Sequence, residues 1–167
     1  GRHVLAPKGG ITVQINAFNF PVWGLLEKFA PAFLAGVPTL AKPATPTAHV
    51  AEALVRTMLE SGLLPEGSLQ LLVGSVGDLF DALDHRDSVF FTGSKATADR
   101  LRRHPAFLER GALFNAEADS LNPAILGEKA TEEELSRLAQ EIAQELVIKT
   151  GQRCTAIRRV FAPKDRL

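Results

Sequence analysis

Short apolar runs alternate with amphipathic stretches along the first two thirds of the chain. The apolar runs are rich in β-branched residues or end at turn-forming residues, which is typical of strands. They cover residues 11–16, 39–42, 69–73, 88–91 and 113–117. Apolar residues at helical spacing lie between them and predict helices at 22–35, 46–61, 78–83 and 95–103. This alternation predicts an α/β fold, a parallel, doubly wound sheet with helices on both faces.

The rhythm changes after about residue 120. A strand is predicted at 122–126, and a long amphipathic helix begins with a capping box between Thr131 and Glu134. A last strand is predicted at 156–163. We therefore expect one domain over 1–120 and the opening strand, helix and strand of a second over 121–167.

The last predicted strand has no evident partner, because only four residues follow it. Unpaired strands expose backbone groups that natural domains usually cover. We expect the chain to be a fragment of a longer protein. The alternative is a natural short chain that pairs its edges by forming an oligomer.

Composition excludes several classes of partner. Nineteen basic residues balance nineteen acidic ones, so no net field favours nucleic acid or an anionic membrane. No run approaches the roughly 18 apolar residues of a membrane helix. The lone Cys154 cannot form an internal disulfide, which fits a reducing, cytoplasmic location.

Candidate functional residues follow the predicted strands one after another. In a doubly wound sheet, ligands bind beyond the carboxyl ends of the strands. The residues at these ends are Asn19, Lys42, Gly74, Gly77, Thr92, Gly93, Ser94 and Glu117. Their common position predicts a single site at one edge of the sheet.

Each of these residues, taken singly, has a plain structural explanation beside the functional one. The glycines would let a pyrophosphate approach the backbone at a helix N-terminus, or they only make tight turns. Glu117 would serve as a general base if buried, or is an exposed carboxylate. Asn19 could donate to an oxyanion or shape a turn, and Lys42 could bind ribose and phosphate or lie at the surface.

Cys154 offers a nucleophile, because the thiolate is the reactive form. A single cysteine is often only a small buried hydrophobe. Its neighbour Arg153 favours the functional reading, since a nearby cation stabilises a thiolate.

Together these segments resemble the aldehyde dehydrogenase superfamily across nearly the whole chain. INAFNFP at 15–21 resembles its Asn-Phe-Pro signature and KPA at 42–44 its lysine-proline cofactor motif. FTGS at 91–94 is similar to its pyrophosphate turn, and GQRC at 151–154 to its nucleophile motif. The resemblance is strongest to the dehydrogenase half of the ring-opening enzymes of bacterial phenylacetate degradation. The semialdehyde dehydrogenases of the benzoate epoxidation pathway have very similar motifs and are the alternative.

The resemblance implies an enzyme that oxidises an aldehyde, here a CoA-linked semialdehyde, to its acid. Cys154 would attack the aldehyde carbon, the Asn19 amide and the Cys154 N–H would hold the oxyanion, and Glu117 would activate water. It also implies that the full-length parent is a homo-oligomer. The fragment alone is expected to be inactive, and a cofactor-binding module without turnover is the rival interpretation.

Two positions depart from the family pattern. Thr45 stands where many members have a glutamate that binds the adenosine ribose, so we expect NADP to be preferred over NAD. Ala98 stands where relatives often have glycine, which puts in doubt how closely that helix approaches the pyrophosphate.

A cysteine hydrolase is disfavoured because His3, His49, His85 and His104 lie away from the predicted edge, and no spacing of ligands predicts a metal site.

Overall fold

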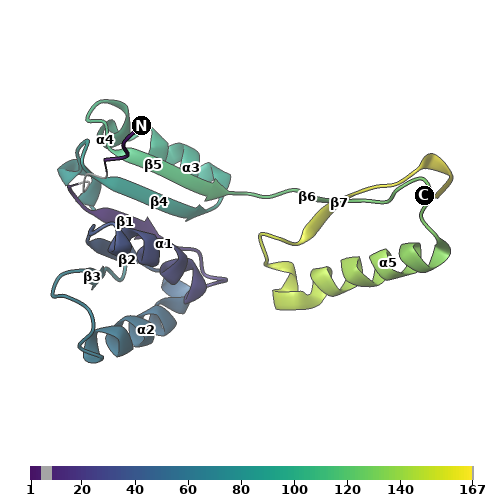
Figure 1. Ribbon diagram of the computed structural model, residues 1–167, viewed down its shortest axis with the longest axis horizontal. Helices are drawn as coiled ribbons and strands as arrows, with labels where there is room; N and C mark the ends of the chain where they lie inside the picture. The colour runs from purple at the N-terminus through teal and green to yellow at the C-terminus, as the bar shows by residue number, and fades with distance from the viewer. Residues whose placement is uncertain (5–8, 167) are drawn as a thin grey trace. The chain divides into compact units, whose positions relative to one another are not determined.

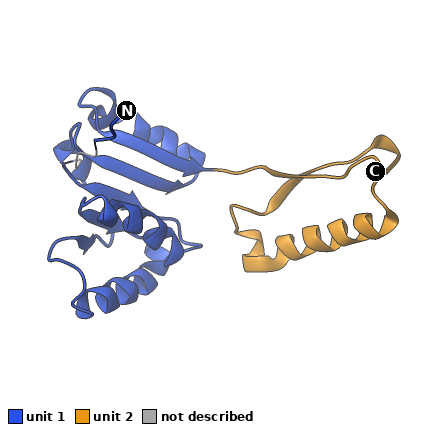
Figure 2. Ribbon diagram, viewed as in Figure 1, with its two compact units in different colours: residues 1–118 blue, residues 119–167 orange. Residues whose placement is uncertain are grey.

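The computed structural model describes residues 1–4 and 9–166. These residues form two compact units, residues 1–118 and residues 119–167 (Figure 2). Unit 1 contains all the strand ends at which candidate residues were expected, and unit 2 contains Cys154.

Unit 1 is built on a five-stranded parallel sheet (Figure 1). Its strands are β1 (Thr12–Ile15), β2 (Thr39–Lys42), β3 (Leu69–Leu71), β4 (Ser88–Gly93) and β5 (Leu113–Ala118). The order across the sheet is β3-β2-β1-β4-β5, and every neighbouring pair is parallel. The chain thus builds outward from β1 on one side and then returns to place β4 on its other side. This reversal makes the β1–β4 boundary the switch point at which doubly wound sheets bind ligands.

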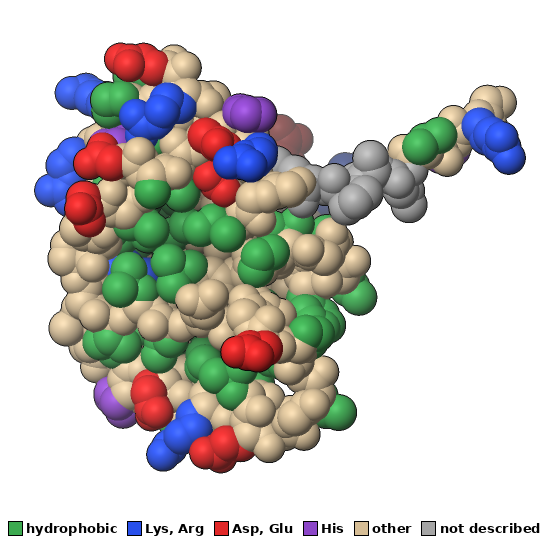
Figure 3. Space-filling view, turned by 90° about the vertical axis from the view of Figure 1, so that its left-hand side faces the viewer, with side chains coloured by type: hydrophobic (Ala, Val, Ile, Leu, Met, Phe, Trp, Pro, Cys, Tyr) green, Lys and Arg blue, Asp and Glu red, His purple; other side chains and the backbone are tan. Residues whose placement is uncertain are grey.

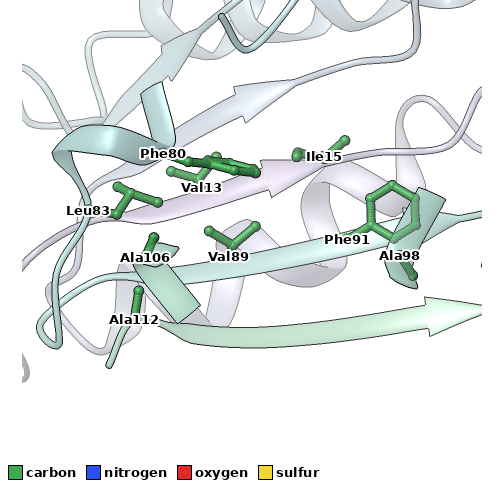
Figure 4. Packing of buried hydrophobic residues seen from close by; sticks show 9 residues of the cluster. All are labelled: Val13, Ile15, Phe80, Leu83, Val89, Phe91, Ala98, Ala106 and Ala112. Carbon is green, nitrogen blue, oxygen red and sulfur yellow. The ribbon is translucent and has the colours of Figure 1, made fainter. Parts of the chain in front are cut away.

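Helices cover both faces of this sheet, as the sequence predicted. Helices α1 (Trp23–Leu34) and α2 (Ala48–Glu60) pack through Leu25, Phe29 and Val55 on one face. Helices α3 (Lys95–Arg102) and α4 (Pro105–Leu108), with the 3-10 turn η2 (Leu79–Ala82), cover the other. The hydrophobic core between the sheet and this second face's helices contains Val13, Ile15, Phe80, Leu83, Val89, Phe91, Ala98, Ala106 and Ala112 (Figure 4).

A buried glutamine fastens α1 to the sheet. Gln14, in the middle of β1, is fully buried and points toward α1. In the orientation that satisfies both ends of its carboxamide, Nε2 donates to the Leu25 carbonyl (3.2 Å) and Oε1 accepts from the Phe29 N–H (2.9 Å). A polar side chain buried in a sheet is tolerated only with such partners.

We expect Gln14→Leu to lower the free energy of unfolding by about 1–3 kcal/mol, since two buried helix groups lose their side-chain partner. The measurement is urea-induced unfolding followed by circular dichroism. Gln70→Leu, at an exposed position of β3, is the matched control and should change the midpoint little. Equal midpoints for Gln14→Leu and the unchanged chain would contradict the role assigned to this side chain.

The structure differs from the predicted elements where short 3-10 turns replace helix. The predicted helix at 46–61 begins as the 3-10 turn η1 (Thr45–Thr47), and that at 78–83 is only η2. Helix α4 was not predicted, because its four residues are too short to show a period. Its signal was local: Pro105 at the first position and the His104 side chain, whose Nδ1 accepts from the Ala106 N–H (3.2 Å).

Unit 2 contains one strand pair and one long helix. Its elements are β6 (Asn122–Ile125), α5 (Glu132–Val147), η3 (Ile148–Gly151), β7 (Ile157–Phe161) and η4 (Lys164–Arg166). The expectation that the last strand lacks a partner is wrong, because β7 pairs with β6 in parallel. The helix between them supplies the crossover that parallel pairing requires.

Helix α5 begins as the sequence predicted. Thr131 caps it, and the Thr131 and Glu134 side chains bond reciprocally to each other's backbone N–H groups. These hydrogen bonds from Thr131 lower the pKa of Glu134. No residue of α5 is buried within unit 2, whose buried apolar residues are Leu126 and Ala156.

Charges of both signs are mixed on the surface of unit 1. On the face at which the strands begin, acidic and basic side chains gather together above and below a band of hydrophobic ones (Figure 3). That face therefore presents no field of a single sign.

Candidate active site

The candidate residues of unit 1 lie along the carboxyl edge of the parallel sheet. Because all five strands run in the same direction, the residues that follow their last positions meet at one edge. Lys42 ends β2, Asn19 lies in the loop after β1, and Thr92 and Glu117 lie near the ends of β4 and β5. Unit 1 thus brings these four positions to the same side of the sheet.

A polar row crosses the sheet at the switch point. Thr92 of β4 is opposite Glu117 of β5, and Ile15 of β1 is opposite Phe91. Asn16 follows Ile15, so it continues the row on the same face as Thr92 and Glu117. Asn16, directly after the end of β1, thus places an amide on the same face as the hydroxyl of Thr92 and the carboxylate of Glu117.

Two members of this row are buried polar groups without hydrogen-bond partners. Both polar atoms of the Asn16 side chain and the Thr92 hydroxyl are in this state, whereas Glu117 is exposed. The burial that would favour a general base is therefore absent at Glu117 within unit 1. Sequence reasoning missed Asn16, although a polar residue directly after the central strand was a usable signal.

The β1 and β2 ends are tied to each other. The Asn16 N–H donates to the Lys42 carbonyl (3.0 Å). Lys42 is half-buried, and its Nζ donates to the Pro43 carbonyl at 3.1 Å. Thr45, three residues on, is exposed at the start of η1. Lys42 thus contributes a cation and Thr45 a neutral hydroxyl to the segment that follows β2.

The loop after β3 needs glycine for its backbone conformation. Gly74 and Gly77 have φ values of 112° and 53°, a region that side chains disfavour. A Cβ at either position would meet nothing within 4 Å. The Gly77 N–H is already bonded to Ser75 Oγ at 3.1 Å. The backbone conformation of the loop, and not close packing against protein atoms, therefore explains why positions 74 and 77 are glycine.

Gly93 has a different explanation. It is the last residue of β4 and not part of a turn after the strand, and its φ is not positive. A Cβ there would lie 2.5 Å from Cζ of Phe91. Phe91 is a buried core residue on the same face of β4. Glycine at 93 thus makes room for the Phe91 ring.

The turn into α3 has the geometry of a helix N-terminus. Ser94 caps α3 by accepting from the Thr97 N–H at 3.3 Å. Ala98, the departure from the family pattern, is 3% exposed and packs in the core beneath β4. The Ala98 methyl group is therefore accommodated in the core on that face of the sheet.

Cys154 lies in unit 2, exposed, in the loop between η3 and β7. The chain enters this loop through Lys149, Thr150 and Gly151, with φ values of 50°, 57° and 71°. Two consecutive non-glycine residues in this region are strained. Such strain is often found at functional sites.

Arg153, the cation next to Cys154 in the sequence, is paired with a carboxylate. The Arg153 Nη1 forms an ion pair with Glu145 of α5 at 3.0 Å, and both side chains are largely buried. A carboxylate beside the guanidinium offsets its charge. Arg153 thus joins the loop to α5 and does not face Cys154 as an uncompensated cation.

Residues 1–4 and 9–166 contain no group of three or more His, Cys, Asp or Glu side chains able to hold a metal. Within the same residues, no helix combines the length and apolar character needed to cross a membrane.

Known proteins are similar to this chain in sequence and in structure. The model of the aldehyde dehydrogenase family matches residues 3–167. A 3,4-dehydroadipyl-CoA semialdehyde dehydrogenase of Aromatoleum evansii is 52% identical over 165 residues, which are 98% of this chain and 32% of the relative. The chain thus spans about a third of the length of such curated relatives.

Solved structures share the fold. An indole-3-acetaldehyde dehydrogenase of P. syringae, in complex with NAD+ and IAA, has a TM-score of 0.81 at 24% identity, over 93% of this chain and 31% of that one. A succinic semialdehyde dehydrogenase of Streptococcus pyogenes, in complex with NADP+, has a TM-score of 0.77 at 22% identity, over 95% of this chain and 34% of that one. With motifs, fold and family match in agreement over nearly all its residues, the chain belongs to the aldehyde dehydrogenase family.

Proposed function

We propose that the complete protein oxidises an aldehyde to a carboxylic acid with NAD(P)+, through a covalent intermediate on Cys154. The family match over residues 3–167 carries this proposal, because it includes Asn19, Glu117 and Cys154 together. In this proposal, residues 1–120 bind the cofactor and residues 121–167 open the catalytic domain.

Unit 1 has features that suit a dinucleotide. The sheet has its switch point between β1 and β4, where Asn16 and Thr92 keep polar atoms without protein partners. The N-terminus of α3 follows directly, and the glycine loop after β3 is open on the Cβ side. Lys42 and Thr45 would contact the adenosine ribose, and Gly74, Gly77, Thr92, Gly93 and Ser94 would line the pyrophosphate and nicotinamide. The bound cofactor supplies the acceptor for the hydride.

The residues of the chain would do the remaining chemistry. The Cys154 thiolate adds to the aldehyde carbon, and the Asn19 amide and the Cys154 N–H stabilise the oxyanion. Loss of hydride from that carbon leaves a thioester on Cys154. Glu117 takes a proton from water, and the resulting hydroxide releases the acid and regenerates the thiolate.

The name of the relative with 52% identity supports a CoA-linked semialdehyde as the substrate class. It fits both subgroups that the motifs resemble, that of phenylacetate degradation and that of benzoate epoxidation. We propose a homo-oligomer in the cytoplasm as the working form. The 167-residue chain alone is expected to turn over no aldehyde.

The test uses the full-length protein with NAD+ or NADP+ and a series of CoA-linked and free semialdehydes, followed through the absorbance of the reduced nicotinamide. We expect turnover with CoA-linked semialdehydes, and much lower kcat/KM with the free ones. No reduced cofactor with any pair would overturn the proposed function.

A preference for NADP forms part of the proposal, since Thr45 places no carboxylate where a 2′-phosphate would lie. We expect Thr45→Glu to shift the ratio of kcat/KM values toward NAD by about tenfold or more, through charge repulsion of the phosphate. Both cofactors are compared at one aldehyde concentration, with Thr57→Glu on the exposed side of α2 as control. An unchanged ratio in Thr45→Glu would remove this explanation.

A further inference from the structure

The side chain of Asn122 holds the main chain on both sides of Thr155. Its Nδ2 lies 2.5 Å from the Cys154 carbonyl oxygen and 3.3 Å from the Ala156 carbonyl oxygen. Its Oδ1 accepts from Ser120 Oγ at 2.8 Å, which fixes the orientation of the amide. We propose that Asn122 is a positioning residue for Cys154, an inference that rests on the function proposed above. We call this set of hydrogen bonds the Asn122 clamp.

An irregularity in the strand pair places Asn122 at this loop. Asn122 is opposite Ile157, but the next residue, Pro123, is opposite Arg159, so β7 has one extra residue at this point. Proline cannot donate a ladder hydrogen bond, and bulges of this kind redirect a side chain. The Asn122 amide therefore bonds to the loop carbonyls that precede the regular part of β7.

The loop has reason to need such a clamp. The chain enters it through the strained residues Lys149 and Thr150, and Cys154 itself is exposed. Its entry is held by Arg158, whose Nη2 donates to the Gly151 carbonyl at 2.6 Å. The Asn122 clamp is what holds the Cys154 carbonyl. Because this carbonyl is held, rotation about the Cα–C bond of Cys154 is restricted. The backbone that carries the Cys154 Sγ is therefore restricted to fewer conformations.

Placement of the nucleophile matters to the rate. A misplacement of about 1 Å at a reacting group costs about 100-fold in rate. The Asn122 side chain bonds to Ser120, Cys154 and Ala156 and to none of the residues proposed to bind the cofactor, so cofactor binding should change little. The clamp therefore predicts a loss in kcat without a matching change in KM.

The test compares full-length Asn122→Asp and Asn122→Ala with the unchanged protein. Aspartate keeps the shape and the bond from Ser120 but lacks the donor, and alanine removes the donor without adding charge. We expect kcat to fall about 100-fold in both, with Kd for NADP+ and the melting temperature nearly unchanged. Gln140→Glu, which removes an exposed amide from α5, is the control and should retain full activity.

A second readout does not require turnover. Amide hydrogen exchange over residues 152–156 should be faster by about tenfold in Asn122→Ala, because the loop opens more easily. If the unchanged protein oxidises no aldehyde, the proposed function is wrong. The rates of amide hydrogen exchange still test whether the Asn122 clamp holds the loop. Unchanged exchange, an unchanged kcat, or a loss of kcat matched by loss of NADP+ binding would overturn the inference.

Discussion

Cys154→Ala in the full-length protein should abolish aldehyde oxidation while cofactor binding survives. Removing a nucleophile that acts as a unit with its partners costs at least about 1,000-fold in kcat. Cys154 lies in unit 2, whereas the residues proposed to bind the cofactor belong to unit 1. The two functions should therefore separate. The measurements are the rate of nicotinamide reduction and a titration with NADP+ followed by protein fluorescence.

A matched variant makes this result decisive. Ser136→Ala removes an exposed hydroxyl from α5 in the same unit and should leave both measurements unchanged. Cys154 is exposed and contributes little to the core, so the melting temperature of Cys154→Ala should stay close to that of the unchanged protein. Joint loss of activity, NADP+ binding and melting temperature would identify a structural cysteine instead.

The second large effect is expected at Glu117. Glu117→Gln should allow the first turnover and then stop, because the thioester forms but the water that hydrolyses it lacks its base. A burst of about one equivalent of reduced nicotinamide per site should precede a steady state slowed by about 100-fold or more. Stopped-flow absorbance separates the two phases.

The burst distinguishes this role from others. A loss of both burst and steady state would place Glu117 before hydride transfer, as the base that activates Cys154. Glu128→Gln, at an exposed position after β6, is the control and should show neither change. An unaltered steady state in Glu117→Gln would contradict the hydrolytic role.

The exposure of Glu117 bears on how the site is completed. Its neighbour in the polar row, Thr92, already has a buried hydroxyl, whereas Glu117 lies in the open on β5. The chain spans about a third of its curated relatives. We expect covering residues of the complete protein to provide the burial that a general base requires.

The periodicity of apolar residues alone predicted much of the fold. The strands predicted at 11–16 and 39–42 became β1 and β2 within a residue or two, and the capping box at Thr131 marked the start of α5. These signals are local, because a strand or a helix start depends on neighbouring residues. The resemblance of motifs indicated the family. The periodicity of apolar residues by itself did not indicate it.

Only the tertiary structure decided features that depend on residues far apart in the chain. The order β3-β2-β1-β4-β5 sets the switch point and so the polar row of Asn16, Thr92 and Glu117, of which the first and last lie 101 positions apart in the chain (117 − 16). The pairing of β7 with β6 likewise joins residues far apart in the chain, and it corrects the expectation that the last strand has no partner.

The same division holds for single residues. The sequence showed a cation beside Cys154, but only the tertiary structure showed that Arg153 is paired with Glu145 of α5. It showed a glycine after a strand, but the Phe91 ring explained why position 93 has no side chain. Local sequence determines which element forms and which chemical groups it carries. Which groups meet, and which neutralise or crowd one another, follows from long-range packing that no local pattern encodes.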